Sequence, residues 1–167
     1  MLLKLVTFKT SIGWLGILYS PRGIKKIMLS QKAKSDILRQ AGEPYDLVEQ
    51  NHHLEGLIKR LENYLNGDVV TFSDNLDIAG ATKFQQKVWN VTRSIPYGET
   101  RSYAWVSEKL GYNKRATRAV GQALGRNPVP IIIPCHRVIG SSGSLVGFSM
   151  GLGLKEHLIN LEYRKSK

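Results

Sequence analysis

The chain has 167 residues, of which 42% are hydrophobic and 22% charged, a composition typical of a folded globular protein and not of a disordered one. Its one cysteine excludes an internal disulfide and, with only four histidines, argues against a structural zinc site, while the lack of a signal-like or 18-residue apolar run predicts a cytoplasmic protein with no membrane partner. The net charge of +11 lies almost wholly in residues 81–167, where 14 Lys and Arg stand against 4 Asp and Glu, whereas residues 1–80 hold 10 against 9.

Such a concentrated positive charge favours a polyanionic partner, most commonly nucleic acid. Solubility, or adaptation to salt or heat, would explain the charge equally well, so composition leaves both interpretations open.

Residues 1–80 predict a small sheet with helices. Three strand-like segments, 3–8, 14–19 and 24–29, are separated by glycines and by Pro21-Arg22-Gly23, which predicts an antiparallel meander. We expect a short helix and a loop in 31–47, a helix over 49–65 and a further strand over 69–76. Nothing in this half suggests chemistry, and a linker at 78–81 predicts domains over 1–78 and 82–167.

The second half predicts helices. Thr82 can cap a helix that ends at Ile95-Pro96, Ser102 can cap one over 103–110, and Asn113 can cap one over 114–125. The short turn between the last two is typical of a helix-turn-helix. The last helix carries a predicted buried stripe at 116, 119, 120, 123 and 124, and small residues, Ala119 among them, on its exposed side. Its basic face could meet phosphates, although an isolated basic helix is more often a solvated face.

The run Ile133-Pro134-Cys135-His136-Arg137-Val138 suggests a reactive thiol. The β-branched run 131–133 predicts a buried extended segment that would place Cys135 in a pocket, where burial raises a thiol's pKa. His136 is the nearest base and Arg137 a neighbouring cation. Neighbours on a strand point to opposite sides, so His136 would need a helical turn or a bridging water to act on the thiol. Glu162, at the end of a predicted helix over 154–162, could orient the imidazole.

A lone cysteine is most often an inert buried residue, and a Cys-His pair is a weak signal. These residues taken alone therefore leave catalysis and simple packing open.

Several blocks of the second half, in order, resemble the O6-alkylguanine-DNA alkyltransferases. Pro134 to Val138 is similar to the active-site motif of that family; the other blocks are 95–100, Ser102-Tyr103, 118–121, Asn127-Pro128 and the Gly-rich loop up to Lys155. The resemblance covers about 84–162, and residues 1–80 match only in length and strand–helix character. It implies an α/β (α+β) protein with a ribonuclease-H-like N-terminal domain and a mostly helical C-terminal domain containing the helix-turn-helix.

The resemblance also implies a function. It implies direct repair of O6-alkylguanine in duplex DNA, mainly O6-methylguanine and possibly O4-methylthymine, by irreversible transfer of the alkyl group to Cys135. Each molecule would act once, as a monomer and without a cofactor, after flipping the base out of the minor groove.

Site roles follow from the same resemblance. Cys135 would accept the alkyl group, His136 would act as base through a water, Glu162 would orient His136, Asn127 would brace the turn, and Tyr103 would protonate guanine N3. The implied substrate pocket comprises Val138, Phe148, Ser149 and Met150. Arg118 would fill the vacated stack, and the implied DNA contacts are Arg115, Ala119, Gln122 and Ser102.

The chain departs from the family pattern in one loop. Met150-Gly151 stands where Gly-Gly is common, and Phe148 where tyrosine is common.

Three other interpretations remain. A helix-turn-helix regulator would explain the charge but not the cysteine motif. A non-catalytic damage binder would lack a reactive cysteine, and a Cys-His hydrolase would turn over repeatedly and need an oxyanion hole.

Overall fold

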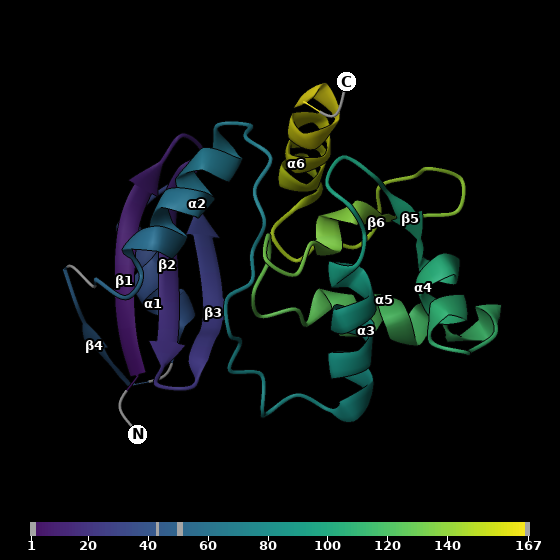
Figure 1. Cartoon of the computed structure of the whole chain (residues 1–167), viewed down its shortest axis with the longest axis horizontal. Helices are drawn as coiled ribbons and strands as arrows, with labels where there is room; N and C mark the ends of the chain where they lie inside the picture. The colour runs from purple at the N-terminus through teal and green to yellow at the C-terminus, as the bar shows by residue number, and fades with distance from the viewer. Residues whose placement is uncertain (1–2, 43, 50–51, 166–167) are drawn as a thin grey trace. The chain divides into compact units, whose positions relative to one another are not determined.

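The computed structural model describes residues 3–42, 44–49 and 52–165 and forms two compact units, Met1–Ile78 and Ala79–Lys167 (Figure 1). The first unit is a four-stranded mixed sheet with two helices, and the second is mostly helical.

Three long strands form the sheet of the first unit. β1 (Leu3–Thr10), β2 (Gly13–Ser20) and β3 (Gly23–Ser30) pair antiparallel, which confirms the predicted meander. The turns contain Gly13 and Gly23, whose φ angles of 127° and 139° suit glycine far better than other residues. A fourth strand, β4 (Tyr45–Leu47), runs parallel to β1. The sequence predicts only a short helix and a loop over 31–47, so this strand was missed.

Both faces of this sheet are apolar. Leu5, Leu18 and Met28 pack against Ile37 and Ala41 of helix α1 (Lys34–Ala41). The alternate residues are buried on the face that helix α2 (Glu55–Leu65) crosses in Figure 1. Because successive strand residues point to opposite faces, neighbouring apolar residues such as Leu5 and Val6 in β1, or Ile17 and Leu18 in β2, bury both sides.

Two predictions for this unit are wrong. The α2 helix begins at Glu55, not at 49; residues 50 and 51 lie outside the described part of the chain. Residues 69–76 form no strand, since only a single bridge, between Leu76 and Ile24, joins them to the sheet.

Helices α3 (Lys83–Arg93), α4 (Tyr103–Lys109) and α5 (Thr117–Gly125) build the core of the second unit. The predicted caps are confirmed: Thr82 accepts from the Gln85 amide in a capping box, and Ser102 accepts from the Trp105 amide at 3.0 Å. Asn113 caps a separate turn, η1 (Lys114–Ala116), so the third helix is shorter than predicted. Val120, Ala123 and Leu124 are buried as expected, whereas Ala119 is exposed.

The remaining elements carry the cysteine and the end of the chain. A single 3₁₀ turn, η2 (Cys135–Arg137), leads into strand β6 (Val138–Ile139), which pairs parallel to β5 (Arg101–Ser102). Helix α6 (Leu152–Lys165) closes the unit. No helix within the described residues is long and apolar enough to cross a membrane.

Candidate active site

Cys135 begins the η2 turn, which replaces the extended backbone expected there. Residues 131–133 are buried, but they form a tight turn in which Ile131 has a φ of 75°, so the predicted extended segment is wrong. The side chain of Asn127 holds this turn, since its Nδ2 donates to the Ile133 carbonyl at 2.8 Å and to Cys135 Sγ at 3.0 Å. The helical turn brings Cys135 and His136 onto one compact element.

The Cys135 thiol is buried, and only 7% of the residue is exposed. Burial raises the pKa of this thiol, while the Asn127 hydrogen bond and the positive charge of Lys155 oppose part of that rise. The net direction is upward, so the thiol needs a base to become the nucleophilic thiolate.

His136 is fully buried, and its Nε2 lies 2.7 Å from Glu162 Oε1 on helix α6. Burial lowers the pKa of His136, the hydrogen bond and charge of Glu162 oppose that effect, and the charges of Arg137 and Lys155 add to it. A neutral imidazole that donates through Nε2 keeps Nδ1 as the basic nitrogen.

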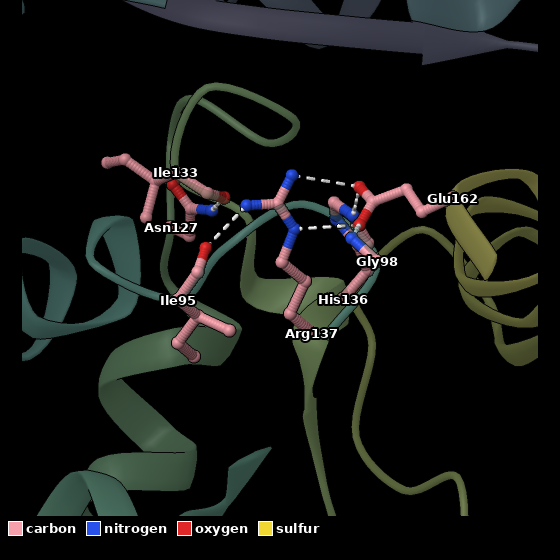
Figure 2. A network of polar contacts seen from close by, with 7 residues as sticks. All are labelled: Ile95, Gly98, Asn127, Ile133, His136, Arg137 and Glu162. Atoms are coloured by element: carbon pink, nitrogen blue, oxygen red, sulfur yellow. Dashed lines mark hydrogen bonds and ion pairs between the residues drawn. The ribbon is translucent and has the colours of Figure 1, made fainter. Parts of the chain in front are cut away.

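Arg137 points to Glu162 (Figure 2). Its Nε donates to Oε2 at 2.8 Å, its Nη2 to Oε1 at 3.0 Å, and its Nη1 to the Ile95 carbonyl at 2.7 Å. The amide of Gly98 also donates to Glu162 Oε2, at 3.0 Å. The sequence names Arg137 as the cation beside the thiol, but the charge that opposes part of the rise in the pKa of Cys135 comes from Lys155.

Glu162 is 1% exposed. Burial alone would raise its pKa, but the hydrogen bonds and charges of His136 and Arg137 lower it from 4.5 to about 2. The carboxylate is therefore charged at neutral pH.

A second polar cluster surrounds Lys155, whose side chain is fully buried. The ammonium donates to the Val138 carbonyl at 2.6 Å and the Val146 carbonyl at 2.8 Å, and lies 3.5 Å from Tyr103 Oη. The Tyr103 hydroxyl itself donates to the Val146 carbonyl at 2.8 Å. Burial raises the pKa of Tyr103 and lowers that of Lys155.

Sequence reasoning missed Lys155 and assigned Arg137 a different neighbour. One signal was available: Lys155, Leu158 and Glu162 lie at i, i+3 and i+7 of α6, the spacing of a single helix face. Charged residues in register with a buried leucine indicate buried ionic groups, which are rare unless they are paired or functional.

A cavity of about 430 Å³ is lined by residues of both helices of the predicted DNA-binding motif. Tyr103 and Ala104 of α4, Thr117, Arg118 and Gly121 of α5, and Ser141, Val146 and Gly147 of the following loop line it. Cys135 is not among its lining residues.

The predicted DNA contacts divide into two groups. Arg115, Arg118, Ala119 and Gln122 are exposed at the η1–α5 segment. Ser102 is half-buried, and its hydroxyl serves as the N-cap of α4.

Of the predicted substrate-pocket residues, only Val138 is hydrogen-bonded to the turn that carries Cys135 in the described part of the chain. Val138 is buried, its amide donates to the Cys135 carbonyl, and its own carbonyl accepts from Lys155. Phe148 and Met150 are half-buried and Ser149 is exposed, and within the described chain no hydrogen bond ties their side chains to Cys135.

The first unit has its own cavity, of about 410 Å³, bordered by Tyr19, Arg22, Ile24, Leu54 and Asp74 among others. Two of its lining residues form ion pairs with residues outside the lining, Arg22 with Asp77 and Asp74 with Arg60. Among residues 3–42, 44–49 and 52–165 no group of three or more His, Cys, Asp or Glu side chains could hold a metal ion.

Comparison with known proteins identifies relatives over both units. Residues 83–164 match the family described as 6-O-methylguanine DNA methyltransferase, DNA binding domain. A methylated-DNA–protein-cysteine methyltransferase of Methanosarcina acetivorans is 39% identical over 156 residues, which cover 93% of this chain and 95% of that protein. One from Mycobacterium leprae is 50% identical over 115 residues, or 69% of this chain and 68% of that protein.

Solved structures agree with these matches. The crystal structure of Mycobacterium tuberculosis OGT in complex with DNA superposes with a TM-score of 0.82 at 33% identity, covering 97% of this chain and 94% of that one. An O6-methylguanine-DNA methyltransferase from the archaeon Pyrococcus kodakaraensis gives a TM-score of 0.72 at 27% identity, covering 95% and 98%.

Proposed function

Because the chain belongs to the methylated-DNA–protein-cysteine methyltransferase family, we propose that Cys135 is the residue onto which it takes the methyl group of O6-methylguanine in DNA. One observation supports the proposal above all. The sole cysteine, Cys135, shares a 3₁₀ turn with the buried His136, and His136 is hydrogen-bonded to the buried, charged carboxylate of Glu162.

The first step is proton removal from Cys135. His136, held by Glu162 through Nε2, takes the proton at Nδ1, through a bridging water. Glu162 stays ionised and stabilises the imidazolium that forms. Asn127 donates to the sulfur and braces the turn, and Lys155 provides the positive charge that favours the thiolate.

The thiolate then attacks the methyl carbon. The S–C bond forms as the C–O6 bond breaks, and the electron pair of that bond passes to the guanine. Tyr103 protonates the base at N3, which makes guanine a neutral leaving group, and Lys155 stabilises the resulting phenolate from 3.5 Å. The products are S-methylcysteine and guanine. A thioether is stable, and a protein with one cysteine has no second thiol to remove the methyl group, so each molecule acts once.

DNA binding is proposed for the second unit, which carries the net charge of +10. We infer that the exposed face of η1 and α5, with Arg115, Arg118, Ala119 and Gln122, enters the minor groove, where its small residues permit close approach. The base must leave the duplex to reach a buried thiol, at a cost of about a few kcal/mol. Arg118 supports the gap, and the loop with Phe148, Ser149 and Met150 closes around the flipped base together with Val138. Ser102 contributes by fixing the first turn of α4, which carries Tyr103.

The protein acts as a monomer on double-stranded DNA in the cytoplasm, without a cofactor, and O4-methylthymine is a possible second substrate. The alternative function is a helix-turn-helix protein that senses damage without catalysis.

One assay tests the proposal. Duplex DNA carrying a methyl-labelled O6-methylguanine is mixed with increasing amounts of protein, and the label on protein is measured. We expect one methyl group per protein molecule and none on C135A, which should bind the duplex as well as the natural chain does. Label on C135A would mean that another nucleophile acts, repeated turnover would indicate a hydrolase, and DNA binding without any transfer would favour the damage sensor.

A further inference from the structure

Arg137 joins Glu162, the partner of His136, to the segment that contains Ile95 and Tyr97. Its guanidinium uses three N–H groups, two toward Glu162 on α6 and one toward the Ile95 carbonyl in the segment before α4 (Figure 2). The Tyr97 ring lies 5.8 Å from the guanidinium carbon, and the side chain is only 11% exposed. A side-on contact to both carboxylate oxygens fixes the plane of the carboxylate as well as its position.

The donors to Glu162 in the described part of the chain include His136 Nε2, Arg137 Nε, Arg137 Nη2 and the Gly98 amide, at 2.7 to 3.0 Å. A carboxylate offers about four lone-pair sites. With these donors in place, a proton on Glu162 would displace an existing bond. The carboxylate is therefore held as an acceptor and has one orientation toward the histidine.

We propose that Arg137 is a positioning residue for methyl transfer, which holds Glu162 as the fixed, charged acceptor of His136 Nε2 so that His136 takes the Cys135 proton at Nδ1. This inference rests on the proposed function of His136 as the base.

Arg137 also affects how strong a base His136 is. Among the described residues, the charged groups that act on His136 are Arg137 on its own turn and Glu162 and Lys155 on α6. The segment at Gly98 adds an amide to Glu162 and the Tyr97 ring beside Arg137. With Arg137 present, protonation of His136 takes the Arg137–Glu162–His136 group from neutral to a net charge of +1. Without Arg137, protonation takes it from −1 to neutral, which is easier. Arg137 therefore keeps His136 unprotonated, and able to accept a proton, at lower pH.

This dual action can be separated by two substitutions. R137K keeps the charge but cannot grip both oxygens side-on, whereas R137Q removes the charge and keeps a hydrogen-bond donor. Single-turnover transfer from duplex DNA is measured between pH 5.5 and 9, using the whole chain. We expect both variants to be slower on the plateau, R137Q by about tenfold because a misaligned base is costly. The acid limb should move to higher pH in R137Q and stay in place in R137K.

A matched control is R101Q. Arg101 lies in the same unit and pairs with Glu99 at 2.5 Å, and it does not act on His136. We expect its rate and pH profile to match those of the natural chain.

Equal losses in R137K and R137Q with the acid limb unmoved would overturn the proposal, since that pattern indicates a structural role only. H136Q separates this from failure of the proposed function: if H136Q leaves the natural acid limb intact, then His136 is not the base, whatever Arg137 does.

If R137Q fails to fold, the natural chain still tests the proposal. Nitrogen-15 NMR of the arginine side chains, assigned with R137K, should give an Arg137 Nε–H that exchanges slowly with water and Nη groups that do not average by rotation. Free rotation of the Arg137 guanidinium would overturn the inference.

Discussion

Each unit buries one carboxylate beside an arginine, and only one of the two pairs belongs to a reactive site. In the first unit Asp77, 8% exposed, accepts from Ser20 Oγ at 2.6 Å and pairs with Arg22 at 3.2 Å. The side chain of Arg22 is 63% exposed, against 11% for Arg137 beside Glu162. Both carboxylates have a lowered pKa, Asp77 chiefly through the Ser20 hydrogen bond.

The two carboxylates differ in the group that each one contacts besides its arginine. Asp77 accepts a hydrogen bond from the Ser20 hydroxyl, which neither gains nor loses a proton at ordinary pH. This hydrogen bond ties the end of β2 to the segment after α2. Glu162 meets a histidine on the same turn as the cysteine. A buried ion pair is therefore weak evidence of function, whereas a carboxylate that orients a base beside a nucleophile is strong evidence.

The strongest test of this comparison removes each negative charge with an isosteric amide. E162Q should slow methyl transfer by about 100-fold or more, because a general base contributes 10²–10⁴-fold and this one would lose its orienting acceptor. D77N should leave the transfer rate unchanged and lower the free energy of unfolding by about 1–2 kcal/mol. Single-turnover rates and urea unfolding measure the two effects. A rate loss in D77N similar to that in E162Q would mean that both pairs act only through stability.

Acid should weaken the two pairs at different pH values. Folding depresses the pKa of both His136 and Glu162, so the unfolded chain binds more protons, and stability is lost as pH falls. For His136 the loss begins below its ordinary pKa of 6.5, and for Glu162 it runs from 4.5 to about 2. The Glu162 shift corresponds to roughly 3 kcal/mol. Asp77 loses its contribution only below its ordinary pKa of 3.8.

Urea unfolding at pH 7, 5.5 and 4 checks this order. We expect H136Q to flatten the loss between pH 7 and 5.5, E162Q to flatten the loss nearer pH 4, and D77N to change neither. Stability that is constant from pH 7 to 4 in the natural chain would contradict the assigned shifts.

Local signals account for what the sequence predicted of the fold. Short apolar, strand-like segments separated by glycine turns located β1 to β3, and hydroxyl caps located the starts of α3 and α4. The strand β4 was missed because its three residues pair with β1, some 40 positions away, and carry no pattern of their own. Val69 to Leu76 has strand-like residues, but it makes only one bridge, so propensity without a long partner predicted wrongly.

The site was predictable to the extent that it depends on residue identity. His136 contacts Glu162, the pairing that the resemblance implied, and Asn127, which was expected to brace the turn, hydrogen-bonds to Ile133 and to Cys135. The η2 turn and the direction of Arg137 were not predictable, because they depend on the unusual backbone at Ile131 and on a loop carbonyl at Ile95 far away in the chain. The roles of these residues in transfer stay predictions.

A third test compares exposed arginines of the two units. R118A should slow repair of duplex DNA by about tenfold and leave the reaction with free O6-benzylguanine within about twofold, because a free base needs no extrusion from a stack. R22A, which removes an exposed arginine from the first unit, should change neither reaction. An equal loss on both substrates in R118A would rule out a role in base flipping.

The smallest effect on reaction rate is expected from Met150, in the loop that follows Val146. Lys155 fixes the carbonyls of Val138 and Val146, whereas Met150 follows after the loop has left that anchor, and is half-buried. If this loop forms a wall of the alkyl pocket, the methionine takes space that a large planar benzyl group needs and a methyl group does not.

M150G should therefore react with O6-benzylguanine about threefold faster than the natural chain, a modest gain because methionine is flexible and can move aside. Repair of O6-methylguanine in duplex DNA should be unchanged. Glycine also loosens the backbone, and M150A separates the two causes, since it removes the long side chain without that added freedom. The rates at which O6-benzylguanine inactivates the three proteins decide the question. A faster rate in both variants assigns Met150 to the pocket wall, whereas a faster rate in M150G alone assigns the effect to backbone mobility. An unchanged rate in both variants means that Met150 points away from the alkyl group.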